Sequence, residues 1–301
     1  MRRAAVIALV AAALALCPPV PTRAQEAPTQ RMNAIGLIDF GARPAFKVGD
    51  FAKYHMSALS AHGVVDDYTL TVLIAGEEDW WGEECFWIET WTESRTSGNQ
   101  TVASLMAYDV FQDSLALKHM QLYVRKTVNE VNEDGSPREV IYKRPTSTLK
   151  TREPLGSQFR LQIDTLGTET VTVAKGTFEC RKLRFLQGRG ATGAKGDSTD
   201  YTELREERTT FLNPEIPISH IVREDINQSF TRKAWKVGHS KEGTPTVTLD
   251  QTSGSAELVD FGHGLSARMV PEAVRRSLAE QRAAASKPAP APKPATRRKA
   301  G

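Results

Sequence analysis

Apolar and polar residues alternate along most of this chain, and that period of two restricts its fold more than any other feature. Tyr68, Leu70, Val72 and Ile74 take every second position of one segment. Successive side chains of a β-strand point to opposite faces, so this segment is predicted to be a half-buried strand. Further strands are predicted at Val102–Phe111, Leu115–Lys126, Arg138–Lys143, Gln158–Ile163, Glu169–Val173, Phe178–Leu186, Thr199–Leu212, Ile218–Asp225, Ser229–Val237, Thr246–Leu249 and Ala256–Phe261. Many strands at short spacing, with Gly and Pro in the turns, predict an all-β sandwich or barrel.

One predicted strand, Cys85–Glu93, is apolar on both faces. Phe86 and Ile88 point to one side of it, and Trp87 and Trp91 point to the other. A strand that is covered on one side only does not need apolar residues on both. We therefore expect a central strand of a curved sheet whose concave face is filled by a helix, a lid or a ligand.

Helical signal is scarce in the body of the chain. The clearest predicted helix is Pro271–Ala285, because proline suits a first helical turn and good helix formers follow it. Residues 287–301 are rich in Pro, Ala, Lys and Arg and are predicted to be an extended, disordered tail. We thus expect an N-terminal arm (25–46), a β domain (47–265), a C-terminal helical segment (266–286) and this tail.

The first 24 residues have the order of a bacterial secretory signal peptide. Arg2 and Arg3 precede a short apolar run, and the small residue Ala24 stands at the predicted cleavage position. The apolar run is too short for a membrane anchor, which needs about 20 residues. Lipid attachment at Cys17 is the less favoured alternative, because cleavage after Ala24 fits the small-residue rule better. The sequence therefore predicts a periplasmic protein, with secretion as the alternative.

The charge of the chain argues against a nucleic-acid partner. Removal of Arg2, Arg3 and Arg23 with the signal segment lowers the 39 basic residues to 36, which equals the 36 acidic residues. The tail from Lys287 holds basic residues and no acidic one, so a mildly acidic body carries a basic tail. A solvated terminus is the favoured interpretation of this tail, and contact with anionic envelope polymers is the alternative. The mixed charges of Glu203–Arg208 are predicted to protect an exposed strand edge from aggregation.

The chain without its signal segment keeps two cysteines, Cys85 and Cys180, and both fall on predicted strands. An even pair in an oxidising compartment is a candidate disulfide. Two buried free thiols are the alternative. Neither cysteine has the neighbours of a nucleophile.

The sequence contains no motif that supports a cofactor site or a metal site. Residues 188–193 formally fit a dinucleotide fingerprint, but they stand between β-type segments, so we expect a flexible hairpin loop. The six histidines never take metal-ligand spacing. We therefore expect no cofactor, no metal and no catalytic residue, and the chain is predicted not to be an enzyme.

Three segments resemble bacterial envelope proteins of the LolA/LolB-like type. The first is the turn and strand Val171–Leu183, with its Gly-Thr-Phe-Glu-Cys run; the second, Phe211–Val222, leads through two prolines into a further strand; the third is the closing strand Glu257–Gly262. The resemblance implies a half-open β-barrel, which is a strongly curved antiparallel sheet around a hydrophobic cavity, with minor α structure. The best-understood members of the group carry lipoproteins across the periplasm.

Two functions are expected on these grounds. In the first, an exported, non-enzymatic protein binds or carries a hydrophobic ligand. That ligand is the acyl chain of a lipid or a lipoprotein, or another hydrophobic molecule. The alternative is an envelope structural or protein-interaction module with a filled core and no ligand. The residues expected to line a cavity are Leu70, Val72, Trp87, Trp91, Met120 and Leu122. Ordinary core packing is the competing interpretation of each of them.

Overall fold

The computed structural model describes the chain at residues 45–60, 65–94, 99–112, 122–131, 137–143, 158–195, 198–235 and 246–286. The predicted signal segment, the basic tail and most of the predicted arm lie outside these residues. The strands are β1 (Phe51–Ser60), β2 (Val65–Trp80), β3 (Glu83–Ser94), β4 (Gln100–Ala107), β5 (Val124–Val131), β6 (Pro137–Ile141), β7 (Gln158–Val173), β8 (Gly176–Lys195), β9 (Ser198–Leu212), β10 (Ile221–Trp235) and β11 (Thr246–Gly262). The described residues also form the 3-10 helices η1 (Tyr108–Gln112) and η3 (Glu272–Val274) and the α-helix α4 (Leu278–Ala285).

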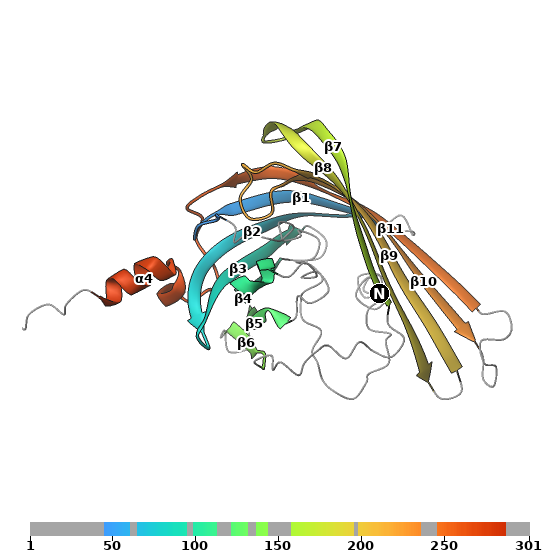
Figure 1. Cartoon of the computed structure of the whole chain (residues 1–301), viewed down its shortest axis with the longest axis horizontal. Coiled ribbons are helices and arrows are strands. Elements are labelled where there is room, and N and C mark those ends of the chain that lie inside the picture. Colours follow the sequence, from blue (N-terminus) through green and yellow to red (C-terminus); the bar gives the residue numbers. More distant parts are fainter. Residues whose placement is uncertain are drawn as a thin grey trace, which may run out of the picture.

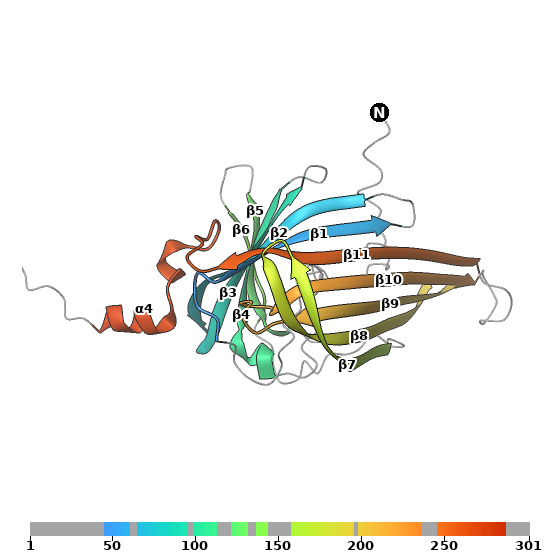
Figure 2. The same ribbon diagram turned by 90° about the horizontal axis from the view of Figure 1, so that it is seen from above.

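All of these strands belong to one antiparallel sheet, in the order β6-β5-β4-β3-β2-β1-β11-β10-β9-β8-β7. The first strand, β1, pairs with the last, β11, and this ladder joins the β1–β6 half to the β7–β11 half. The two halves descend on opposite sides of an arch (Figures 1 and 2). Strands β6 and β7 form the two edges, so the sheet is open. Figure 1 shows that the sheet is also strongly curved. The predicted half-open, all-β architecture is confirmed.

Several strands are longer than their sequence pattern predicted. Strand β10 joins two predicted strands, and Ile226, Asn227 and Gln228 in its middle pair with both β9 and β11. Strands β7 and β11 likewise each join two predicted strands. Backbone hydrogen bonds to a neighbouring strand hold such polar stretches extended, and the sequence pattern does not report them.

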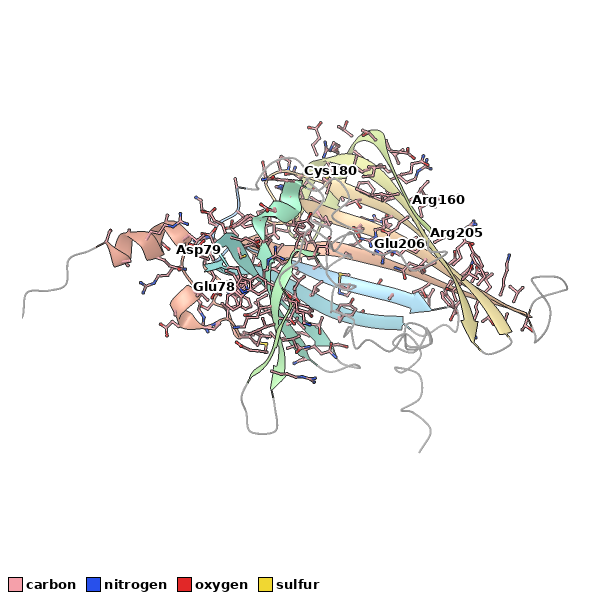
Figure 3. The ribbon with its side chains drawn as sticks, turned by 60° about the horizontal axis from the view of Figure 1, so that its bottom comes forward. Glu78, Asp79, Arg160, Cys180, Arg205 and Glu206 are labelled. Atoms are coloured by element: carbon pink, nitrogen blue, oxygen red, sulfur yellow. The ribbon has the colours of Figure 1, made fainter. Side chains whose placement is uncertain are left out.

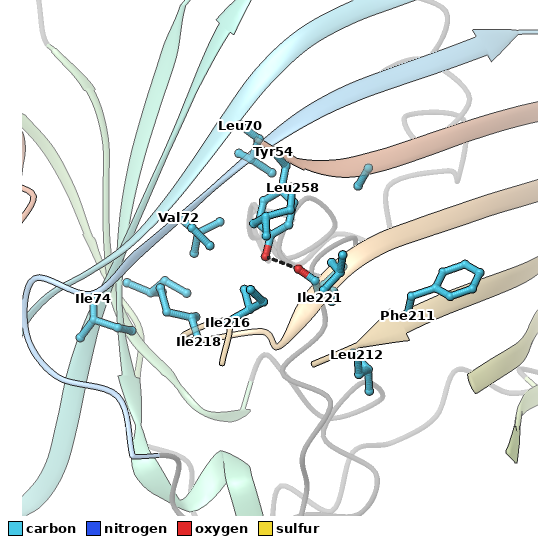
Figure 4. Close-up of a cluster of buried hydrophobic side chains, with 14 of the residues drawn as sticks. Tyr54, Leu70, Val72, Ile74, Phe211, Leu212, Ile216, Ile218, Ile221 and Leu258 are labelled. Carbon is cyan, nitrogen blue, oxygen red and sulfur yellow. Dashed lines mark hydrogen bonds between the residues drawn. The ribbon is translucent and has the colours of Figure 1, made fainter. Parts of the chain in front are cut away.

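The concave side of the arch holds the larger hydrophobic core, which we call the inner cluster. Figure 4 shows its side chains between the two halves of the sheet. Its larger members are Tyr54, Leu70, Val72, Ile74, Phe86, Ile88, Met106, Phe111, Phe185, Phe211, Leu212, Ile216, Ile221 and Leu258. The predicted alternation of β2 is confirmed, because Leu70, Val72 and Ile74 all face this side.

A second core, the outer cluster, lies on the convex side of β2–β5. It consists of Leu73, Ala75, Cys85, Trp87, Trp91, Ala103, Leu105, Ala107, Val128 and Val270. Both faces of β3 are therefore buried, as its sequence predicted. Its inner face packs on η1, where the rings of Phe86 and Phe111 lie 5.5 Å apart. Its outer face is covered by residues from the C-terminal end of the chain, a cover that the sequence did not indicate.

The C-terminal strap (residues 263–286) makes this outer cover, and it is held by buried polar contacts. The carboxylate of Glu89 is fully buried and accepts hydrogen bonds from the backbone N–H groups of Arg268, Met269 and Val270, at 2.6, 2.9 and 3.2 Å. The guanidinium of Arg268 lies 4.2 Å from the centre of the Trp91 ring. Because the carboxylate serves three donors of an irregular segment, it compensates groups that no sheet or helix satisfies.

The predicted helix Pro271–Ala285 is shorter than expected. Pro271 has an extended backbone, with φ −56° and ψ 139°, and precedes only the short turn η3. The α-helix begins at Leu278, because Ser277 caps it and forms a capping box with Glu280. Helix α4 lies outside the arch (Figure 1).

The predicted disulfide is absent, and both Cys85 and Cys180 are buried free thiols. Cys85 belongs to the outer cluster on β3, whereas Cys180 belongs to the inner cluster on β8. Five strands separate β3 from β8 in the sheet. A disulfide needs the two Cα atoms within about 7 Å, a separation that these positions do not allow.

Two loop and edge predictions are also corrected. The glycine-rich run 188–193 lies within β8 and pairs with β9, where Gly190 faces Glu203. The charged run Glu203–Arg208 lies on β9, which has β8 and β10 on its two sides and is not an edge. Its residues therefore divide between the two faces of the sheet.

Candidate functional site

Five polar side chains gather on the concave face where β9 and β10 run side by side. We call Glu206, Arg208, Thr210, Glu224 and Gln228 the polar cluster. In the register of the two strands, Thr210 lies opposite Glu224 and Glu206 lies opposite Gln228. Side chains at alternate positions share one face of a sheet, so the ladder places the polar cluster on one side. Figure 3 shows Glu206 and its neighbour Arg205 on β9.

Hydrogen bonds connect most of the polar cluster. The Nε of Arg208 and the Nε2 of Gln228 both donate to the carboxylate of Glu206. The hydroxyl of Thr210 donates to Oε2 of Glu224 at 3.3 Å. The guanidinium Nη1 of Arg208 lies 3.7 Å from Oε1 of Glu224. Arg208 therefore links the two carboxyl groups.

Glu224 is the unusual member of the polar cluster. Its side chain is fully buried, and its Oε1 has no hydrogen-bond partner. Burial raises the pKa of this carboxyl to about 8, the nearby charge of Arg208 opposes the rise, and that of Glu206 adds to it. Near pH 7 this carboxyl therefore holds its proton in most molecules.

Both apolar and polar side chains border the polar cluster on the same face, where Gln187 of β8 lies opposite Glu206 and Arg189 lies opposite Leu204. Phe185 of β8 lies opposite Arg208, and Ile226 of β10 lies opposite Arg208 on the other side. Further along the two strands, Leu204 lies opposite Phe230. Leu204, Ile226 and Phe230 are each partly exposed. The concave face of the β8–β11 half therefore offers an accessible apolar surface next to a buried polar cluster.

The concave face of strands β1–β3 is covered by tightly packed side chains. The β9–β10 connection, residues 213–220, turns into the arch, where Ile216 and Ile218 join the inner cluster. The Tyr54 hydroxyl lies 2.6 Å from Ser219 Oγ and donates to the carbonyl of Ile221, which holds this connection against β1 (Figure 4). Ile218 and His220 have positive φ values of 73° and 58°. A β-branched residue rarely takes this conformation, so the connection stores backbone strain.

The structure does not bring the predicted cavity residues together. Leu70 and Val72 face the concave side within the inner cluster, whereas Trp87 and Trp91 face the convex side beneath the C-terminal strap. Leu122 is half-buried, and its carbonyl accepts from Arg125. Met120 lies outside the described residues. The two tryptophans are therefore removed from the predicted lining, because their side of β3 packs against the strap.

The polar cluster is not evident from the sequence. Glu206, Arg208 and Thr210 stand at alternate positions between Leu204 and Leu212, which is the pattern of a polar stretch on an otherwise apolar face. Charged side chains are usually solvated, so the sequence pattern of this run predicts an exposed edge. The pairing of β9 with β10, which adds Glu224 and Gln228, could be learned only from the structure.

No helix among the described residues is both long enough and apolar enough to cross a membrane. In the same part of the chain, no three His, Cys, Asp or Glu side chains are grouped so that they could hold a metal ion.

Comparison with known proteins finds similarity only among solved structures, since no family model and no curated protein matches the chain. An exported protein with a YmcC-like fold from Bacteroides fragilis shares 11% identity, covers 73% of this chain and 97% of its own, and has a TM-score of 0.29. A lipoprotein from Parabacteroides distasonis shares 9% identity, covers 73% and 97%, and has a TM-score of 0.31. A LolA superfamily protein from Nitrosomonas europaea shares 9% identity, covers 81% and 95%, and has a TM-score of 0.25. These matches therefore include the superfamily that the sequence resembles, but at such TM-scores they transfer no ligand and no function to this chain.

Proposed function

We propose that this chain is an exported periplasmic protein that binds a lipid acyl chain or another hydrophobic ligand on the concave face of its sheet. The observation that carries the proposal is the accessible apolar surface of the β8–β11 half. Leu204, Ile226 and Phe230 are partly exposed there, although they stand on the concave side of the sheet. The signal-like segment 1–24 supports export.

The position of this surface favours a ligand over ordinary packing. Covering apolar surface stabilises a complex by roughly 25 cal/mol per Å², so an acyl chain gains free energy along the whole length of such a surface. The binding residues that we propose are therefore Leu204, Ile226 and Phe230, in place of Trp87 and Trp91.

The proposed role is binding and not catalysis. Glu206 already accepts hydrogen bonds from Arg208 and Gln228, an arrangement that fixes these groups instead of presenting them to a reacting substrate.

A second candidate is an envelope interaction module with a filled core. The observation that favours it is the packing of the 213–220 connection and of η1 on the β1–β3 half, where Ile216 and Val110 are fully buried. In that case the loops, the edges and the basic tail would carry the function.

Native mass spectrometry of the protein purified from a bacterial periplasm tests the first proposal. We expect a stoichiometric adduct that solvent extraction identifies as a molecule with an acyl chain. A protein without any adduct that also fails to take up a fluorescent fatty acid would support the second candidate.

Two neighbouring substitutions locate the binding face. We expect Ile226→Asp to weaken fatty-acid binding at least tenfold, because it places a charge on the apolar surface. Asn227→Asp is the matched control, since Asn227 is exposed and its side chain leaves the opposite face of β10. Equal affinities of the two variants would exclude this surface as the site.

A further inference from the structure

We propose that β7 is an interaction edge at which two copies of this chain pair, with the middle of the contact at Gln162. This interface goes beyond the proposed function, because it does not depend on a bound ligand. It follows from the length of the edge, from its exposed apolar side chains and from the order of its charges.

The two edges of the sheet differ in how they are protected. Strand β6 has five residues and begins with Pro137. Short strands and prolines keep an edge from pairing with another chain. Strand β7 has 16 residues, contains no proline and has β8 as its one neighbour among the described strands (Figure 2). The β7 edge therefore offers a further strand a much longer row of backbone donors and acceptors than β6 does.

The regular part of β7 sets the middle of the contact. Its register with β8 shifts between Thr165 and Gly167, and Gly167 has a φ of 106°. Such a bulge bends a strand and interrupts regular pairing. An edge partner can therefore follow β7 over residues 158–166, whose middle residue is Gln162. Two antiparallel copies of this segment, related by a two-fold axis, place Gln162 opposite its own copy.

This register places opposite charges across the interface. Arg160 of one copy lies opposite Asp164 of the other, and because the contact is symmetric this pair occurs twice. Arg160 is exposed on the edge strand (Figure 3). The hydrogen bond from Arg184 lowers the pKa of Asp164, so this carboxyl is ionised at neutral pH. Opposite charges at facing positions of neighbouring strands stabilise their pairing.

The neighbouring charges on the same face keep this arrangement balanced. Arg184 of β8 donates from Nε and Nη2 to Oδ2 of Asp164, at 3.2 and 2.7 Å. The charge of Glu207 on β9 acts in turn on Arg184. Farther along β9, Arg205 is paired with Glu203. Each half of the interface therefore contains equal numbers of guanidinium groups and carboxylates once the second copy is in place.

The same register covers exposed apolar side chains. Ile163 and Leu166 are 47% and 46% exposed. Ile163 of one copy lies opposite Leu161 of the other, again twice. Both residues stand at positions that share the concave face with Phe185, which Ile163 faces on β8. Charged pairs therefore lie on one face of the interface and apolar pairs on the other, and both kinds stabilise the pairing of neighbouring strands.

Pairing at this edge has a consequence for the shape of the assembly. A two-fold axis between antiparallel edge strands stands perpendicular to the sheet, so equal faces of the two copies lie on the same side. The two sheets then form one continuous sheet, and their concave faces are joined at β7.

Crosslinking through Gln162 tests the register on the full-length processed protein. We expect Gln162→Cys to form a covalent dimer with a short bismaleimide, because directly opposite residues of antiparallel strands have β-carbons about 5 Å apart. Thr168→Cys is the matched control, since Thr168 is exposed on the same strand but lies beyond the bulge, far from its own copy in this register. The native thiols, Cys85 and Cys180, are buried. Equal crosslinking at the two introduced cysteines would overturn the register.

Two charge-reversed variants test the pairing in a way that a folding defect cannot imitate. Arg160→Glu and Asp164→Arg should each weaken self-association at least about tenfold in analytical ultracentrifugation, because each homodimer then places like charges opposite one another twice. An equimolar mixture restores both pairs of opposite charge, so it should dimerise with an affinity within about threefold of wild type. A misfolded variant would not recover on mixing. A mixture as weak as either variant alone would overturn the proposal.

The remaining outcomes are also decisive. Wild-type protein that stays monomeric at high concentration and gives no crosslinked dimer through Gln162→Cys would overturn self-association. Crosslinking of monomeric Gln162→Cys to a different periplasmic protein would overturn it as well and would assign the edge to another chain. Ligand binding is measured separately, so a dimer that binds no fatty acid would count against the proposed function alone.

Discussion

Gly76 and Val274 are packed so closely that a β-carbon on Gly76 would lie 2.0 Å from the Val274 carbonyl oxygen. Gly76 belongs to β2, and Val274 belongs to the C-terminal strap. Next to this contact, the backbone N–H of Glu77 donates to the carbonyl of Arg276 at 3.3 Å. The absence of a side chain at Gly76 therefore lets the strap lie directly on the sheet.

We predict that Gly76→Ala loosens the C-terminal strap. The obstacle is backbone, which cannot move aside cheaply, so the variant should lose about 1–3 kcal/mol of unfolding free energy. Hydrogen exchange should accelerate in residues 265–286 before the rest of the sheet. Gly188→Ala is the control, because the nearest atom to a β-carbon there is 4.0 Å away. Equal exchange in the two variants would show that Gly76 is not needed for this packing.

Glu89→Gln should destabilise the protein by about 1.5–3 kcal/mol. Three backbone N–H groups donate to the two carboxylate oxygens of Glu89, whereas a glutamine amide offers them only one acceptor oxygen. Urea unfolding measures this loss. Glu93→Gln is the matched control on the same strand. Its carboxylate makes exposed ion pairs with Lys53 and Arg268, so its removal should cost less than about 1 kcal/mol. A loss at position 89 no larger than that at position 93 would contradict the structural role of Glu89.

The stability of the protein should decrease as the pH rises from about 4.5 to about 8, through the contribution of Glu224. Burial raises the folded-state pKa of this carboxyl to about 8 from its ordinary value of 4.5, so the folded protein binds more protons than the unfolded chain in this interval. The contribution of Glu224 to the unfolding free energy is fully present below the pKa of this group in the unfolded chain. It is lost as the pH rises through the pKa of this group in the folded protein.

Glu224→Gln isolates this effect. The variant should be more stable than wild type at pH 8.5, and the difference should shrink as the pH falls toward 4.5, as measured by urea unfolding at each pH. Glu203→Gln, on the opposite face of β9, is the control and should alter stability by less than about 1 kcal/mol. A difference between Glu224→Gln and wild type that does not vary with pH would refute the prediction.

Cys85 and Cys180 should both be reduced and slow to react. Burial raises the pKa of Cys85 to about 12 and that of Cys180 to about 11, from the ordinary thiol value of 9.0. The thiolate is the reactive form, so alkylation of the native protein at pH 8 should be at least about a hundredfold slower than in guanidinium chloride. Mass spectrometry of unfolded, unreduced protein should show two alkylated thiols. Recovery of these thiols only after reduction would restore the disulfide prediction.

Local patterns predicted much of the sheet, and partners distant in sequence decided the rest. Alternation at Leu70, Val72 and Ile74 is a property of neighbouring residues, so β2 could be recognised directly. What covers the Trp87 face of β3 is the C-terminal strap. This segment is irregular, so it leaves no periodic pattern in the sequence from which its position could be predicted. The candidate site was hidden for a related reason, since Arg208 and Glu224 meet only through the register of β9 with β10.

The ladder between β1 and β11 has a consequence for how the molecule forms. In it, His55 pairs with Glu257 and Ser60 pairs with Thr252, so residues about two hundred positions apart must meet. Hairpins within each half can form early, because their strands are close in sequence. Because synthesis proceeds from the N-terminus, the ladder that joins the two halves cannot form until β11 has been synthesised. Until then, β1 has an open edge that can pair with another molecule, so this interval is when the protein most needs protection from aggregation.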